Sequence, residues 1–564
     1  MMLRTWLLIF LAITSSTLIS TSHASETNET EIASILLEAR DTASTIKDSG
    51  ERATALDFVV TAQTGMDLLG ARNSLKLFPD LLNAPNHLAS LAFRYAKVGD
   101  TQGAEEILTE LFRVSGSEQM VRLSRANALG YVAWAYANVG KFEEANRRLA
   151  ELKKQYEGEN YAIVRDTTAR IAEVQAEHGN VVQAVELAKS VAEDNPYPLM
   201  SIVGGLVRTN NMPQALTILS DLEEWLQQYA KQGIASAQQE LGNLKEAQTT
   251  ARAIKPGHAQ ASAFMTLANH YMKVQDKATA RTLFQEAAAA ASSTTNNWIR
   301  ADILWRIAAG TATAGDSMSA LKIARSIEKD GHKIFAIRDI VKAQAEQGAF
   351  KEAFNTTSLL RPPSSDDESR TETYVHALTE IFTQMVRANR TKEARETAAR
   401  FDGLTSHRTQ LYSAIAATQA DLDDIHGASI TLSYAESEKQ RVARRKEMAR
   451  LIGLLKQGQD SEELRQLRNL QDREYNTLPA LEAMALAYAR RASLTEASKI
   501  ANDLDFHKRV GLYEEIGNTL MVSNRKTAAL QWARALSSPA DKAYALVGIA
   551  RAIATSKQNG NPTK

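Results

Sequence analysis

Apolar positions recur along this chain at spacings of three and four residues, and a short break in the pattern returns at regular intervals. The breaks fall at Gly99, Gly140, Gly179, Asn210, Gly242, Gln275, Gly315, Gly348, Asn389, Asp423, Gly458, Ala492 and Asn524. Their average separation is about 35 residues. Apolar residues at this spacing predict amphipathic α-helices, and a left-handed residue such as glycine commonly ends a helix. The pattern therefore predicts a series of paired helices, each pair joined by one of these turns.

Small residues stand at fixed distances from the turns. Alanine lies five residues after every turn except the one at Gly458, where Glu463 takes its place. Seven residues before each turn a small or apolar residue recurs, most often alanine, and the position eight before is apolar at every turn except for Arg450. These offsets place one apolar stripe on each helix. Because small side chains let two helices approach closely, we expect these positions to pack between helices.

Composition supports an all-α chain. Glycine and proline number 27 and 11 among 564 residues, which is roughly half the usual share. The 66 basic and 66 acidic side chains cancel, so no net field favours nucleic acid or an anionic membrane as a partner. The chain has no cysteine, which excludes disulfides, thiolate zinc sites and a cysteine nucleophile.

The period and its offsets resemble the tetratricopeptide repeat family, whose repeat is about 34 residues long. That family carries glycine and then a polar residue at the turn inside each repeat, alanine five later and a small residue seven before. It also favours an aromatic residue four before the turn, where this chain has Tyr95, Tyr136, Tyr271 and Tyr488. The resemblance covers about residues 86–556, but the closing proline is mostly missing and several intervals stretch to 39–41 residues. It implies a right-handed α-solenoid of about 13 helix-turn-helix repeats, in an exported bacterial member of the family.

The chain divides by pattern into several segments. Residues 25–85 contain helical stretches that predict an N-terminal cap, and residues 86–360 predict a first repeat array. A proline pair followed by an acidic, serine-rich run predicts a linker at 361–372, which is either a hinge or a long loop between repeats. Residues 373–556 predict a second array ending in a capping helix, and 557–564 form a polar tail.

The first 24 residues have the pattern of a signal peptide. A short basic start, Met1–Arg4, precedes an apolar stretch that begins at Trp6, and Ser22-His23-Ala24 supplies the small residues of a cleavage site. The alternative is an uncleaved anchor, but the fully apolar part is far shorter than the ~20 residues that span a membrane. We expect cleavage between Ala24 and Ser25, a periplasmic location with secretion as the alternative, and no membrane span in the mature chain.

Patterns that carry catalysis are missing from the sequence. It contains no glycine-rich phosphate loop, nucleophile-elbow serine or two-histidine zinc helix. His258 and His270 are twelve residues apart and would need a further metal ligand from elsewhere. Adjacent carboxylates such as Glu143 and Glu144 are typical of a solvated helix face. We therefore expect no catalytic residue, no cofactor and no metal.

Two features are candidates for binding a partner. In the tetratricopeptide family the first helix of each repeat lines the concave groove, with groove-facing residues six and ten before the turn, which here are Phe93, Trp134, Asn269, Trp305, Arg338, Lys342 and Asn518. Aromatic rings beside amide and guanidinium groups suit an extended peptide. The alternative is that Phe93 and Trp134 belong to the core between repeats. The second feature is a basic segment at 440–450, which predicts either a site for an anionic partner or a solvated helix face.

The leading hypothesis is a non-catalytic scaffold or adaptor that binds a protein or peptide in the groove of the solenoid. One alternative is an enzyme built from helical hairpins, such as a glycan-acting toroid, which would need aromatic residues and two carboxylates at one place. The other is a self-assembling structural protein. The identity of the partner and the oligomeric state are left open by the sequence.

Overall fold

The structure is a computed structural model that describes residues 28–78, 81, 84–114, 118–156, 161–193, 195–360, 368–401, 407–435, 477–522 and 525–559. Within these ranges the chain is helical and contains no strand. The predicted signal peptide, the basic segment at 440–450 and the turns at Gly458 and Asn524 lie outside the described residues. The all-α prediction is confirmed for the part of the chain that is described.

The chain forms two compact units, of which the first contains residues 1–167 and 485–564. Its helices are a segment at 28–44, α2 Ser49–Met66, α3 Leu68–Leu77, α4 Ala84–Lys97, α5 Thr101–Leu111, α6 Glu118–Asn138, α7 Phe142–Tyr156, α26 Leu494–Asn502, α27 Phe506–Val522, α28 Lys526–Ala535 and α29 Pro539–Asn559. Two helices, α8 Tyr161–Glu177 and a segment at 477–490, cross the boundaries between the units.

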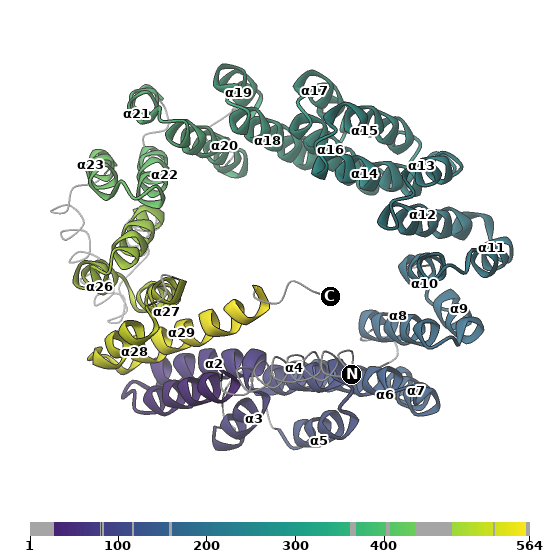
Figure 1. Cartoon of the computed structure of the whole chain (residues 1–564), viewed down its shortest axis with the longest axis horizontal. Coiled ribbons are helices and arrows are strands. Elements are labelled where there is room, and N and C mark those ends of the chain that lie inside the picture. Colours follow the sequence, from purple (N-terminus) through teal and green to yellow (C-terminus); the bar gives the residue numbers. More distant parts are fainter. Residues whose placement is uncertain are drawn as a thin grey trace, which may run out of the picture. The chain divides into compact units, whose positions relative to one another are not determined.

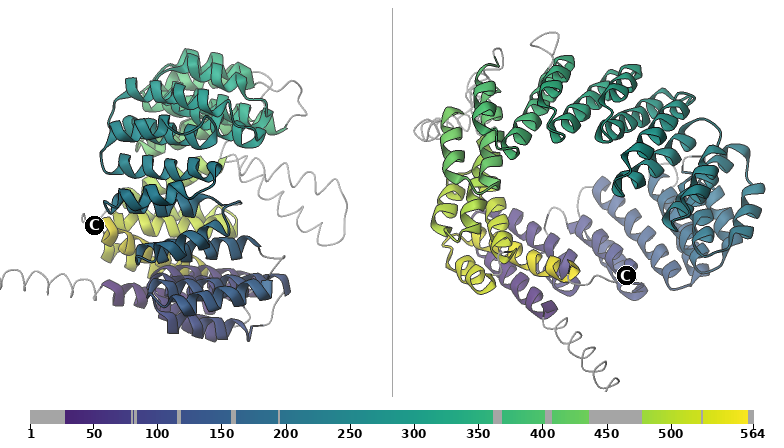
Figure 2. Two further views of the ribbon diagram at one scale, coloured as in Figure 1. Left: turned by 90° about the vertical axis from the view of Figure 1, so that its right-hand side faces the viewer. Right: turned by 45° about the horizontal axis from the view of Figure 1, so that its top comes forward.

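The second unit contains residues 168–484. Its helices are α9 Val181–Lys189, α10 Tyr197–Arg208, α11 Met212–Ser220, α12 Glu224–Glu240, α13 Leu244–Arg252, α14 His258–Lys273, α15 Lys277–Ala291, α16 Asn297–Thr313, α17 Ser317–Ser326, α18 Asp330–Glu346, α19 Phe350–Thr357, α20 Glu368–Arg387, α21 Thr391–Ala399, α22 Arg408–Asp421 and α23 Ile425–Ala435, with a 3₁₀ turn η1 at Ser358–Leu360. Even-numbered helices from α10 to α22 are the first helices of the repeats and lie on the inner side of this curved stack (Figure 1). Their partners lie on the outer side, and Figure 2 shows the helices stacked side by side.

Each turn inside a repeat closes by the same hydrogen bonds. At the first turn the Gly99 amide donates to the Ala96 carbonyl (3.0 Å) and the Asp100 amide donates to the Tyr95 carbonyl (2.9 Å). This pair of bonds is the Schellman motif, which requires a left-handed residue. All predicted turn residues that the structure describes have positive φ, including Ala492 at 61°. The turn prediction is therefore confirmed even where glycine is absent.

The residue after the turn often caps the second helix. The carboxylates of Asp100, Asp276 and Asp316 each accept a hydrogen bond from the backbone amide three residues later, at 2.8–3.0 Å. An aspartate at this position satisfies an amide that has no partner within the helix. Glycine followed by aspartate is thus a stop signal for one helix and a start signal for the next.

The predicted packing positions are buried. Alanine five residues after the turn is fully buried wherever it is found, from Ala104 to Ala529, and the alanines seven before, from Ala92 to Ala485, are at most 2% exposed. The apolar residue eight before the turn is also buried, as with Ile171. Small side chains at both offsets explain how the paired helices approach each other along the whole array.

The two ends of the described chain meet within the first unit. Helix α2 packs against α29 as well as against α4 (Figure 1). Phe58 of α2 stacks on Tyr544 of α29, with ring centroids 4.1 Å apart. Nearby, Arg534 of α28 binds Glu38 of the 28–44 helix at 2.7 Å. The predicted N-terminal cap and the predicted C-terminal capping helix therefore cover each other.

Helices α27 and α29 cross at a glycine contact. A Cβ atom added at Gly517 would lie 2.5 Å from the carbonyl oxygen of Ala545, and one added at Gly548 would overlap the carbonyl oxygen of Glu514. These glycines let the two backbones touch, which is a steric reason for glycine inside a helix. In contrast, a Cβ atom at Gly511 of α27 would meet open space.

The predicted linker at 361–372 is described only in part. Residues 361–367 lie outside the described residues, and α20 begins at Glu368, so the last part of the predicted linker is helical. In the chain, residues 361–367 stand between the 3₁₀ turn η1, which follows α19, and the first helix α20. Helices α18 and α20 pack against each other, and η1 contacts both of them, within the same unit.

Candidate partner-binding surface

An aromatic surface lies on the first helices α16 and α18 of the second unit. It consists of Trp298, Trp305, His332 and Phe335, with Trp298 and Trp305 separated by two helical turns on one face of α16. The ring of His332 lies 5.7 Å from that of Trp298 and 6.1 Å from that of Trp305, and Phe335 lies 5.3 Å from Trp305. The side chains of two adjacent helices thus form one continuous aromatic area.

Local sequence fixes the start of α16 beside this surface. The side chain of Asn296 accepts hydrogen bonds from the amides of Trp298 (2.9 Å) and Ile299 (3.2 Å), which caps the helix. Trp298 therefore lies in the first turn, where it is 63% exposed. The ammonium group of Lys329 lies 4.5 Å from the centroid of its ring, a cation–π contact.

A charged network holds the other end of the aromatic surface. The indole Nε1 of Trp305 donates to Asp339 Oδ2 at 2.7 Å, and the Arg338 guanidinium binds Asp339 Oδ1 at 2.8 Å. Arg338 also lies over the ring of Phe335, with its Cζ 5.3 Å from the centroid. These bonds fix the orientation of the Trp305 and Arg338 side chains.

The structure brings together only some of the predicted groove residues. Trp305 and Arg338 meet through Asp339, whereas Lys342 lies one turn further along α18 and Asn269 lies on α14, both exposed. Asn518 is exposed on α27 in the other unit. These three residues remain predictions as parts of a groove.

Phe93 and Trp134 form a separate pair in the first unit. They lie on α4 and α6, are half-buried, and stack with ring centroids 5.6 Å apart, while Tyr131 approaches Phe93 edge-on at 5.2 Å. The two rings therefore contribute to the packing between α4 and α6 and keep part of their area accessible. Phe93 and Trp134 thus combine features of the two alternatives, residues that line a groove and residues of the core between repeats.

Sequence reasoning missed several members of the aromatic surface. Phe335 lies thirteen residues before the turn at Gly348, one helical turn beyond the two offsets used for the prediction, and Trp298 lies seven residues before Trp305. Extending the same stripe by one and two turns would have found both. The repeat pattern could not identify Asp339, because its hydrogen bond to Trp305 depends on a contact with the neighbouring helix α16.

A cavity of about 420 Å³ opens between α8 and α10 of the second unit. We call it the α8–α10 cavity, and it is lined by Glu173, Ala176, Glu177, Gly179, Val181, Ser201, Ile202, Gly205, Leu206, Arg208, Thr209, Asn211 and Gln214. Burial raises the pKa of Glu173, an effect that a hydrogen bond with Ser201 partly offsets and the nearby charge of Glu177 reinforces. Glu173 lies six residues before Gly179, so it occupies the predicted groove register.

Gly204 and Gly205, which are adjacent on α10, have different surroundings. A Cβ atom at Gly204 would lie 3.0 Å from the carbonyl oxygen of Gly233 on α12, so packing accounts for this residue. A Cβ atom at Gly205 would meet only the tip of Arg208, at 3.9 Å, and otherwise faces the cavity. Packing does not explain why a residue that weakens a helix interior stands at 205.

We expect Gly205→Ala to stabilise the protein by up to about 1 kcal/mol, because alanine favours a helix and its methyl group has room. Gly204→Ala is the matched control and should be neutral or destabilising, since its methyl group presses on the α12 backbone. Urea unfolding followed by circular dichroism measures both midpoints. A loss of stability in Gly205→Ala would show that the cavity wall is not open as described.

We also expect Glu173 to make stability depend on pH. Because burial raises its pKa in the folded state above the ordinary value of 4.5, ionising it as the pH rises above about 4.5 lowers the free energy of unfolding and so destabilises the protein. Between pH 4.5 and 7, the thermal midpoint of Glu173→Gln should therefore fall less, or rise more, than that of the unchanged protein. Glu246→Gln, which alters an exposed carboxylate on α13 outside the cavity, serves as the control. Identical pH profiles for Glu173→Gln and the unchanged protein would refute the assignment.

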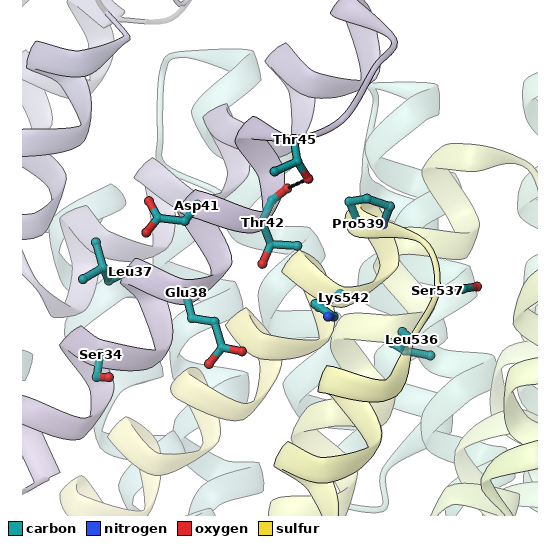
Figure 3. A pocket seen from close by; sticks show the side chains of 10 residues that line it. All are labelled: Ser34, Leu37, Glu38, Asp41, Thr42, Thr45, Leu536, Ser537, Pro539 and Lys542. Carbon is teal, nitrogen blue, oxygen red and sulfur yellow. Dashed lines mark hydrogen bonds between the residues drawn. The ribbon is translucent and has the colours of Figure 1, made fainter.

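A second cavity, of about 610 Å³, lies in the first unit between the 28–44 helix and the corner of α28 and α29 (Figure 3). Its acidic side chains are already engaged, since Glu38 binds Arg534 and Asp41 binds Arg40 at 2.6 Å. Thr45 donates to the backbone carbonyl of Thr42 at 2.7 Å. Both acidic side chains of this cavity are therefore held by arginines.

The part of the chain that the structure describes contains neither a cluster of metal ligands nor a membrane-spanning helix. No three histidine, aspartate or glutamate side chains converge there on a point where a metal ion could bind. In the same ranges, no helix is both long and apolar enough to cross a bilayer. His258 and His270 lie in different environments, since His258 packs near Tyr229, while Nδ1 of His270 accepts a hydrogen bond from Nε2 of Gln239 at 3.0 Å.

Comparison with known proteins gives no family for this chain. No protein-family model and no curated protein matches the chain. Among solved structures it is similar to the pentatricopeptide repeat protein PPR10 from maize, at 12% identity, over 88% of this chain and 70% of that one, with a TM-score of 0.25. It is also similar to a circular tandem repeat protein, at 12% identity over 95% and 99% of the two chains, with a TM-score of 0.13.

The helices and the geometry of the turns show that the described part of the chain is an all-α array of helix-turn-helix repeats. Such arrays offer long surfaces of adjacent first helices that are capable of holding another macromolecule. The described helices form a scaffold of this class.

Proposed function

We propose that this chain is an exported, non-catalytic scaffold or adaptor, a tetratricopeptide-like solenoid that binds an extended segment of a partner protein. The observation that carries the proposal is the aromatic surface on α16 and α18, where Trp298 and Phe335 are 63% and 38% exposed on adjacent first helices. Exposed apolar residues scattered singly are ordinary, but several that are joined into one area are typical of an interaction site.

The chemistry of this surface suits a peptide. Trp298 and Phe335 offer apolar area at a low cost in side-chain entropy, while Lys329 and Arg338 stand beside them to meet carbonyl oxygens. Tryptophan and arginine are the residues that most often dominate the binding energy of an interface. The segment bound here would place one or more apolar side chains against the two exposed rings.

Nearby carboxylates support a binding role over an acid–base role. Asp302 binds Arg306 at 3.1 Å and Asp339 binds Arg338 at 2.8 Å, with Trp305 donating to Asp339 as well. A glycan-acting enzyme would need one carboxyl group to hold a proton and another to act as base or nucleophile. Asp302 and Asp339 are instead each held by an arginine, and Asp339 also positions the indole of Trp305.

The N-terminal pattern supports export as part of the proposal. A basic start, an apolar stretch and Ser22-His23-Ala24 are what a signal peptidase recognises. We expect the mature chain to begin at Ser25 in the periplasm, with secretion as the alternative. N-terminal sequencing of the protein recovered from the cell envelope checks this, and an intact Met1 in that fraction would contradict it.

The binding proposal is tested by recovering the tagged full chain from native cells and identifying the protein that co-purifies. The Trp298→Ala/Phe335→Ala double variant should lose that partner while keeping its helical spectrum. Met318→Ala is the matched control, because Met318 is 85% exposed on the outer helix α17 and should be dispensable for binding. Retention of the same partner by the double variant would refute the proposal.

A further inference from the structure

Ring side chains recur at two fixed positions on the first helices of the second unit. One position lies seventeen residues before the turn and the other thirteen before, so the two are one helical turn apart on the same face. The first position holds Trp225, His258 and Trp298, and the second holds Tyr197, Tyr229 and Phe335. We call these six residues the aromatic row. It includes the two exposed rings of the aromatic surface and extends them to α14, α12 and α10.

The row follows neighbouring helices that are packed together. The ring centroids of Trp225 and Tyr229 on α12 are 6.3 Å apart, and the ring of His258 on α14 lies 6.3 Å from that of Tyr229. Helices α10 and α12, α12 and α14, α14 and α16, and α16 and α18 pack in pairs along the inner side of the stack (Figure 1). Tyr197 and Trp225 are 52% and 39% exposed, so the row is accessible at this end as well as at Trp298.

The charges beside the row are largely balanced within the chain. The carboxylate of Glu223 accepts a hydrogen bond from Nε1 of Trp225 at 2.9 Å, and Asp302 binds Arg306 at 3.1 Å. Burial lowers the pKa of His258, which favours an uncharged ring near neutral pH. The row therefore complements an uncharged ligand.

Hydrogen-bond donors remain available at the row. The indole N–H of Trp298 and the ammonium group of Lys329 can donate hydrogen bonds but cannot accept them. Neither group has an acceptor in the part of the chain that is described, where Lys329 lies over the Trp298 ring. A ligand that brings carbonyl acceptors and few N–H donors matches these groups. Proline supplies such a backbone, because it has a carbonyl group and no N–H.

The spacing of the first helices selects a backbone conformation. Packed helices lie about 8–10 Å apart. A polyproline II helix repeats every three residues and rises about 9 Å in doing so, so every third side chain would meet the next first helix. A β-strand presents the same face about every 7 Å and would fall out of step with the helices.

We propose that the aromatic row binds a proline-rich segment of the partner in the polyproline II conformation, with one turn of the segment on each first helix from α10 to α18. Twelve residues in this conformation span about 37 Å. The four steps between these five helices span roughly 32–40 Å. Aromatic-lined grooves are suited to such segments because the ligand is already extended and loses little entropy on binding. This inference rests on the proposed function for the existence of a partner.

The row is tested with defined peptides, without the natural partner. The full chain is titrated in a calorimeter with acetylated dodecaproline, hexaproline, a glycine–serine peptide of twelve residues and the hexamer of N-acetylglucosamine. We expect dodecaproline to bind, and hexaproline to bind at least tenfold more weakly because it reaches about half of the row. The flexible glycine–serine peptide should not bind.

A variant on α12 separates the row from the aromatic surface on α16 and α18. Trp225→Ala should weaken dodecaproline binding at least tenfold, as expected for an exposed tryptophan anchor, and should keep the helical spectrum. Leu216→Ala is the matched control, because Leu216 is 52% exposed on the outer helix α11 and should not affect binding.

Several outcomes would overturn the inference. Absence of dodecaproline binding, or equal binding of the glycine–serine peptide, would show that the polyproline II conformation is not recognised. Unchanged affinity in Trp225→Ala would place the binding elsewhere, and binding of the saccharide in place of dodecaproline would assign the row to a glycan. If dodecaproline fails to bind but Trp298→Ala/Phe335→Ala still loses the co-purified partner, the proposed function stands and only the proline-rich segment is refuted.

Discussion

Replacing Gly548 with alanine is expected to destabilise the first unit by about 1–3 kcal/mol or more, the cost of overpacking a close contact. The added methyl group would overlap the carbonyl oxygen of Glu514, which is backbone and cannot rotate away. Relief requires α27 and α29 to separate, and α29 also packs on α2. Hydrogen exchange measured by mass spectrometry should show faster exchange in α27 and α29.

Gly511→Ala is the matched control for that change. Gly511 lies on α27 as well, but a Cβ atom there meets open space, so alanine should be neutral or stabilising. Exchange in α16 and α18, which belong to the other unit, should not change in either variant. Equal behaviour of Gly548→Ala and Gly511→Ala would mean that the close crossing of α27 and α29 is wrong.

Trp298→Ala is expected to weaken binding of the co-purified partner by about 2 kcal/mol, which is roughly thirtyfold, as for other aromatic anchors. Because Trp298 is mostly exposed, its removal should leave the unfolding midpoint nearly unchanged. Trp305→Ala should lower both affinity and stability, since Trp305 packs against the core and bonds to Asp339. Isothermal titration with the purified partner gives the affinities.

Met318→Ala again serves as the control, with normal affinity expected. If Trp298→Ala binds the partner as tightly as the unchanged protein, the aromatic surface is not the binding site. A large fall in the unfolding midpoint of Trp298→Ala would instead show that this side chain belongs to the core.

The repeat architecture could be predicted because its determinants are local. A turn such as Gly99–Asp100 requires a left-handed residue and a cap within a few positions, and both can be recognised in the sequence. Ala104 is buried for a similar reason, since its offset from the turn fixes the face on which it lies. The turns, the helix caps and the buried alanines could therefore be predicted, because each depends on residues that are close together in the sequence.

Contacts between distant segments could not be predicted in this way. Phe58 and Tyr544 stack across nearly the whole length of the chain, and no periodic pattern relates them. For the same reason Trp305 and Arg338 could be assigned to one face, but not their shared partner Asp339. Glu173 was overlooked because the prediction sought aromatic and amide groups at a position where this repeat carries a carboxylate.

The most direct test of the central claim is photo-cross-linking in native cells with p-benzoylphenylalanine in place of Phe335, on the first-helix side, or of Met318, on the outer side. Position 335 is already aromatic and 38% exposed, so the reagent should be accommodated without loss of fold. The scaffold account predicts that one partner protein is cross-linked from position 335 and not from position 318. Cross-links to that partner from position 318 alone, or equally from both positions, would contradict it.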